Sequence, residues 1–149
     1  MNLLVYTDGS SAGEGAVRYA ARQAPPGASV LLLHVVPSAR QGALQNGEEV
    51  LARHQEIFRS LAGPGAPPGT RLEVGDAATR ILEVADAFNA DAIIMGSHGH
   101  GAFARSEVMS RAAEETVAAT NRRVILVFPE GSEVVPAADG VPQPEARPG

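Results

Sequence analysis

The sequence of 149 residues contains no cysteine, no tryptophan and no lysine. Without cysteine it forms no disulfide, no thiolate metal site and no cysteine nucleophile. Without lysine it has neither the phosphate-binding lysine of a P-loop nor a lysine that forms a Schiff base. Because only 4% of the residues are aromatic, we expect a core built from Val, Ile, Leu and Ala side chains.

Long apolar stretches and clusters of positive charge are also missing. No apolar run approaches the roughly 18 residues of a membrane helix, and residues 1–10 lack the pattern of a secretory signal. We therefore expect a cytoplasmic protein without membrane contacts. The net charge is −5, but residues 1–129 carry 13 acidic and 11 basic side chains and are nearly neutral. Such a domain lacks the basic surface that nucleic acids require, so no nucleic-acid partner is expected.

Short β-prone runs alternate with segments of helical periodicity along the first 129 residues. The run 28–36 is almost continuously apolar, which is typical of a strand covered on both faces. The last helix is expected over 105–120. This alternation predicts a single α/β domain with a mostly parallel, doubly wound sheet. In such sheets ligands bind at the carboxyl ends of the strands, near the point where the strand order reverses.

The C-terminal segment 130–149 has a different composition, with four acidic residues, one arginine and little apolar periodicity. It is predicted to be a disordered, Pro-rich acidic tail that can be deleted at little cost in stability. The expected strand 124–128 would then form an exposed apolar edge without lysine or internal proline. We expect this edge to pair with its copy in a second chain, giving a homodimer.

A glycine-rich loop over 96–101 follows the fourth expected strand and precedes a helix. Glycines let backbone N–H groups approach phosphate oxygens closely, and a helix N-terminus attracts anions. The loop therefore predicts a phosphate site. A tight turn without any ligand is the alternative interpretation of the same residues.

Several polar residues are candidates for a site. Asp8 ends the first strand, where its carboxylate either accepts a hydrogen bond from adenine or caps the following helix. His34 is expected to be buried and hydrogen-bonded, and His54 to be a partly buried packing residue. His98 and His100 have no carboxylate cluster nearby in the sequence, so no metal site is predicted. No sequence motif of a hydrolase or P-loop enzyme occurs, so no catalytic residue is assigned.

Four segments together resemble the universal stress protein family. They are VYTDGS at 5–10, LLHVV at 32–36, GD at 75–76 and ADAIIMGSHG at 90–99. The resemblance covers about residues 2–128. It implies an open sheet of five parallel strands in the order 3-2-1-4-5, with helices on both faces, as in the adenine nucleotide alpha hydrolase-like fold. It also implies a homodimer through the last strand, Val124 to Phe128.

ATP-binding members of that family carry the pattern Gly-x2-Gly-x9-Gly-[Ser/Thr], and use the first-strand aspartate and the backbone after strand two to hold adenine. Carried over to this chain, the resemblance implies ATP or AMP as the ligand. The implied binding residues are Asp8, Val35, Gly96, Gly99 and Ser110.

This chain departs from the pattern at the third glycine. With the family spacing that position holds Met109, and Ser110 matches the hydroxyl residue. With a loop one residue longer, Ser110 takes the place of the glycine and Arg111 that of the serine. No alignment restores the motif, because no glycine occurs between Gly101 and Gly131. Weak nucleotide binding is therefore expected.

The function implied by the resemblance is a stress-response binding and signalling module with unidentified protein partners rather than an enzyme. The alternative is a slow ATPase or adenylate-handling protein in which the two loop glycines and Ser110 position phosphates. A third reading is an interaction protein whose cleft is vestigial and whose acidic tail makes the contacts.

Overall fold

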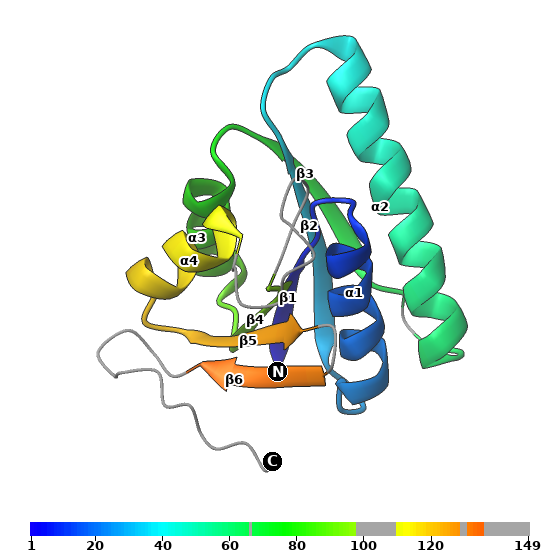
Figure 1. The fold of residues 1–149 in the computed structure, drawn as a ribbon. Coiled ribbons are helices and arrows are strands. Elements are labelled where there is room, and N and C mark those ends of the chain that lie inside the picture. The colour runs from blue at the N-terminus through cyan, green and yellow to red at the C-terminus, as the bar shows by residue number, and fades with distance from the viewer. Residues whose placement is uncertain (66, 98–109, 129–130, 136–149) are drawn as a thin grey trace.

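Strands and helices alternate along the chain in the computed structural model, which describes residues 1–65, 67–97, 110–128 and 131–135 (Figure 1). The elements in chain order are β1 (Asn2–Tyr6), α1 (Ser11–Gln23), β2 (Ser29–Val36), α2 (Gln41–Ala62), β3 (Gly69–Val74), α3 (Ala77–Phe88), β4 (Ala92–Gly96), α4 (Arg111–Ala119), β5 (Arg123–Phe128) and β6 (Gly131–Val135).

The strands form one sheet in the order β3-β2-β1-β4-β5-β6. The first five are parallel, and β1 lies in the middle, with Leu3 opposite Val30 of β2 and Ala92 of β4. The predicted doubly wound sheet of five parallel strands in the order 3-2-1-4-5 is thereby confirmed.

Successive side chains of a strand point to opposite faces of the sheet, and both faces are covered. Leu3 and Val5 of β1 lie in a core with α1 and α2, whereas Leu4 and Tyr6 lie in a second core with α3 and α4 (Figure 1). The run 28–36 behaves as predicted, because Leu32 enters the first core and Leu33 the second. Both cores consist mainly of aliphatic side chains and alanine.

Helix α4 begins later than the sequence predicted. Ser110 has extended backbone angles, and its hydroxyl accepts a hydrogen bond from the backbone N–H of Ala113 at 3.1 Å. It is therefore the N-cap residue, which lies outside the helix. The prediction of helix at this position is wrong, and residues 98–109 lie outside the described residues.

Residues 131–135 form a strand, β6, which the sequence analysis did not predict. It runs antiparallel to β5, with Val124 opposite Val135 and Phe128 opposite Gly131. The disorder predicted for 130–149 is therefore wrong for these five residues. The sheet extends past the predicted domain boundary at 129. Residues 136–149 lie outside the described residues. The segment 130–149 lacks an apolar periodicity, but strand pairing uses main-chain N–H and C=O groups, which every residue of 131–135 provides.

Because β6 pairs along the outer edge of β5, that edge is not exposed. The predicted homodimer through Val124–Phe128 requires an open edge at β5. That premise is therefore wrong. Pairing of two β5 strands requires that β6 leaves its place.

Two glycines of α1 differ in their surroundings. A Cβ atom at Gly13 would lie 2.2 Å from Thr7 Oγ1 and 3.0 Å from the backbone nitrogen of Asp8. A Cβ atom at Gly15 would come no closer than 4.0 Å to Val127. Gly13 therefore permits a close approach of α1 to the end of β1, whereas Gly15 has room for a side chain.

Gly13→Ala should lower the free energy of unfolding by about 1–3 kcal/mol through overpacking. Alanine is a better helix former than glycine by roughly 1 kcal/mol. The matched variant Gly15→Ala should therefore raise the free energy of unfolding by up to that amount. Urea unfolding monitored by circular dichroism measures both. Equal effects of the two substitutions would contradict the close approach of α1.

A chain that ends at Pro129 should lose stability and self-associate, because the apolar edge of β5 becomes open. A chain that ends at Val135 keeps β6 and serves as the matched control, which should retain the oligomeric state and stability of the full chain. Light scattering and thermal melting measure the two properties. If both truncated chains behave alike, β6 does not protect the edge of β5.

Candidate functional site

A cavity of about 390 Å³ opens at the carboxyl ends of β1, β2 and β4. It lies where the chain order reverses, since β1 has β2 on one side and β4 on the other. Its walls also include the first turn of α1 and the N-terminus of α4. Four of the five binding residues predicted from the sequence line it, namely Asp8, Val35, Gly96 and Ser110. The fifth, Gly99, lies outside the described residues.

A larger cavity of about 610 Å³ lies at the opposite end of the sheet, between the segments that precede β2 and β3. Proline, glycine and apolar residues dominate the described part of its lining, and none of these residues is charged. Because the described part of that lining offers no cationic side chain to a phosphate, the cavity at the carboxyl ends is the better candidate for a nucleotide.

Asp8 belongs to the turn between β1 and α1. Its Oδ1 accepts hydrogen bonds from the backbone N–H of Ser10, at 2.9 Å, and from the Ser10 hydroxyl. The hydroxyl of Ser10 is in turn the N-cap of α1 and accepts from the N–H of Gly13. Of the two roles predicted for Asp8, direct capping of α1 is thus taken by Ser10. The carboxylate of Asp8 is held by the turn in the wall of the cavity.

Gly96 ends β4 directly beside α1. A Cβ atom on it would lie 2.6 Å from the carbonyl oxygen of Ala12, a backbone atom that cannot swing away. The fold therefore requires glycine here whether or not a phosphate binds, because the two backbones are in close contact. A glycine that the sequence suggested for ligand binding thus has a structural role of its own.

His34 is buried as predicted, with 8% of its surface exposed. Its Nδ1 lies 2.7 Å from the carbonyl oxygen of Thr7. A carbonyl oxygen only accepts, so Nδ1 carries the proton and donates it. This bond ties β2 to the end of β1, next to Asp8, and so orients the wall of the cavity.

Tyr6 also lines the cavity, which its sequence context does not predict. Burial, followed by the negative charges of Asp8 and Asp76, raises the pKa of its hydroxyl far above the usual range. The phenol therefore stays protonated, and its O–H group remains a hydrogen-bond donor. The only signal in the sequence was its position at the end of the first strand, two residues before Asp8.

The N-terminus of α4 provides the site's potential for anion binding. The backbone N–H of Ser110 donates to the carbonyl oxygen of Ser97 at 2.7 Å, which joins α4 to the end of β4. Arg111 and Ala112, the first helical residues, line the cavity. First-turn N–H groups and the helix dipole attract a negative charge, and the guanidinium of Arg111 adds a full positive charge.

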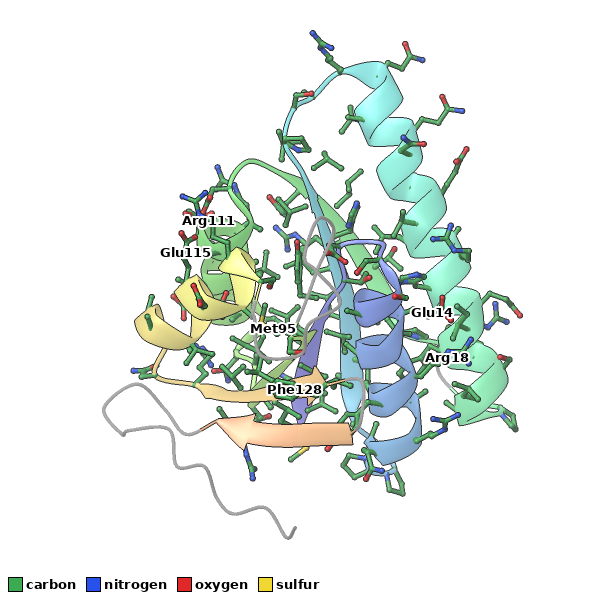
Figure 2. The ribbon with its side chains drawn as sticks, viewed as in Figure 1. Glu14, Arg18, Met95, Arg111, Glu115 and Phe128 are labelled. Carbon is green, nitrogen blue, oxygen red and sulfur yellow. The ribbon has the colours of Figure 1, made fainter. Side chains whose placement is uncertain are left out.

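Arg111 is paired on the outside of the helix. Its Nε lies 3.0 Å from Glu115 Oε2, and its side chain is 87% exposed (Figure 2). Exposed pairs of this kind contribute about 0–1 kcal/mol. Arg111 can therefore leave Glu115 for a ligand at little cost.

Among the described residues, no group of three or more histidine, aspartate or glutamate side chains is placed to hold a metal ion. The same part of the chain contains no helix that is both long and apolar enough to span a membrane.

The sequence model of the universal stress protein family matches residues 1–127. No curated protein sequence matches the chain.

Solved structures share the fold. The universal stress protein of Archaeoglobus fulgidus in complex with dAMP is 24% identical, with a TM-score of 0.69 over 85% of this chain and 96% of the other. A universal stress protein in complex with cAMP is 19% identical, with a TM-score of 0.69 and the same coverages of 85% and 96%. UspA of Lactobacillus plantarum is 19% identical, with a TM-score of 0.70, again over 85% and 96%.

The family model spans every strand of the parallel sheet up to residue 127, and the solved structures have the same fold over 85% of the chain. The resemblance found in the sequence is confirmed. The chain belongs to the universal stress protein family.

Proposed function

We propose that this chain is a stress-response binding and signalling module that holds an adenine nucleotide in the cavity at the carboxyl ends of β1, β2 and β4. The observation that carries the proposal is the convergence of Asp8, Val35, Gly96 and Ser110, from four separate segments, on one cavity. Its volume of about 390 Å³ is in the range of small-molecule sites. Two solved structures with this fold are complexes with dAMP and cAMP.

The two ends of the cavity suit the two ends of a nucleotide. The carboxylate of Asp8 is an acceptor for the exocyclic amino group of adenine, and Val35 lines the cavity beside it. At the other end, the N-terminus of α4 and Arg111 suit a phosphate group. A nucleotide would thus bridge the ends of β1 and β2 on one side and α4 on the other.

We infer that the outer phosphates of ATP are held poorly. The family pattern places glycine where this sequence has Met109, which lies outside the described residues. A nucleoside monophosphate needs fewer donors, so AMP is the ligand that these features favour. The proposed role is regulatory, exerted through protein partners, and the cytoplasmic location stays a prediction.

Arg111→Ala should weaken AMP binding by about tenfold, which corresponds to roughly 1.4 kcal/mol, and leave adenosine binding unchanged. The matched control is Arg18→Ala, because Arg18 also forms an exposed pair with a glutamate four residues away but lies on α1, on the opposite face of the sheet (Figure 2). Calorimetry with AMP and adenosine measures both variants. If the unmodified protein binds neither compound, the proposed function is wrong.

Met109→Gly should strengthen ATP binding measurably, since it restores the glycine of the family pattern and removes a bulky side chain with only a weak acceptor. Calorimetric titration with ATP, before and after the substitution, is the measurement. Unchanged binding would favour the alternative alignment through Ser110 and Arg111. Tight binding by the unmodified protein would show that the motif is complete without the glycine.

A further inference from the structure

His54 is the most unusual polar residue of the α1–α2 layer. Its side chain is completely buried, with 0% of the residue exposed. Within the described part of the chain, neither ring nitrogen has a hydrogen-bond partner. A neutral imidazole carries one donor and one acceptor, so burying both without partners is costly, and native proteins seldom do it.

The ring has little freedom to move toward solvent, because the face of α2 that carries it is packed tightly against its neighbours. Leu51 and Phe58, three residues before it and four after it, belong to the core beneath α1 and α2. Further along the same face, a Cβ atom at Gly47 would lie 2.7 Å from Leu72 and 3.3 Å from the His34 ring. His54 is thus held on the inner face of a helix that is in close contact with β2 and β3.

On balance, the surroundings of His54 disfavour a charged ring. Burial is the largest influence and lowers the pKa of His54; Arg53 on the same helix and His34 of β2 lower it further, while Glu14 of α1 and Asp8 of the β1–α1 turn raise it. Both carboxylates already accept hydrogen bonds, Glu14 from Arg18 at 2.6 and 2.9 Å and Asp8 from Ser10. The result is a pKa below the ordinary value.

We propose that His54 is an acid-sensitive switch whose protonation releases α2 from α1 and β2. Among the described residues no acceptor is hydrogen-bonded to the ring. The cationic ring therefore binds its proton by moving into water, and α2 moves with it. One of the released contacts is that of Gly47 with the His34 ring, and His34 lines the cavity, so the switch acts on the wall of the proposed nucleotide site. The release of α2 itself does not depend on nucleotide binding.

The direction of the pH effect follows from the lowered pKa. In the released or unfolded chain His54 has its ordinary pKa of about 6.5, so that state binds the proton at a higher pH than the packed state. The stability of the packed state is therefore complete above pH of about 6.5. It falls as the pH drops below that value and stops falling below the pKa of the packed state. One proton changes the equilibrium constant by at most about tenfold per pH unit.

The test compares the full chain with His54→Leu, which fills the site with an apolar side chain. Between about pH 7.5 and about pH 5.5 the unfolding equilibrium constant of the unmodified protein should rise more steeply than that of the variant, by up to about tenfold per pH unit below 6.5. Arg59→Gln, an exposed change on the same helix, is the control and should keep the pH dependence of the unmodified chain. A pH dependence of His54→Leu identical to that of the unmodified chain overturns the proposal.

A second measurement on the unmodified protein keeps the test independent of how well the variant folds. Hydrogen exchange, corrected for the intrinsic effect of pH, should show the amides of α2 losing protection at weakly acidic pH before those of β1 and β4. The NMR signals of the His54 ring should report protonation only together with that loss. Titration of the ring near its ordinary pKa, with α2 still protected, refutes the switch.

Discussion

The close approach of α1 to the ends of β1 and β4 is the constraint on which the rest of the structure depends. Two glycines make it possible: Gly13 lies against Thr7 and Asp8, and Gly96 lies against the carbonyl of Ala12. These contacts set the position of the β1–α1 turn relative to the end of β4. Because the candidate site is built from these chain segments, its shape is a consequence of backbone packing rather than of a few polar side chains.

The residues near the cavity have a structural role in addition to the proposed role in ligand binding. Ser10 and Ser110 are helix caps, Asp8 holds its turn, and His34 joins β2 to the carbonyl of Thr7. Each satisfies a backbone group that the fold would otherwise leave without a partner. A nucleotide in this cavity would meet groups that are already oriented, which lowers the entropic cost of binding. Arg111, whose exposed pair with Glu115 is weak, is the more adaptable part of the wall.

Two features lie outside the central strands: the sixth strand at one edge of the sheet, and a buried histidine in the α1–α2 layer. At one edge, β6 folds back along β5 and takes up the main-chain groups that a second copy would otherwise use. On the α1–α2 face, the buried ring of His54 places a polar group in an apolar layer without a partner among the described residues. The parallel order of strands β1 to β5 is the same with both features present.

The sequence alone determined the elements from β1 to β5 and their order, apart from the start of α4, because apolar periodicity and turn residues are local signals. It predicted the parallel sheet, the aliphatic core, the burial of His34 and, through the family resemblance, four residues that meet in one cavity. Tertiary structure decided what depends on distant segments. That Gly96 faces Ala12 and that Tyr6 lines the cavity are contacts between chain segments with no shared pattern. Local sequence carries no record of such contacts, since they arise only when the sheet brings the segments together.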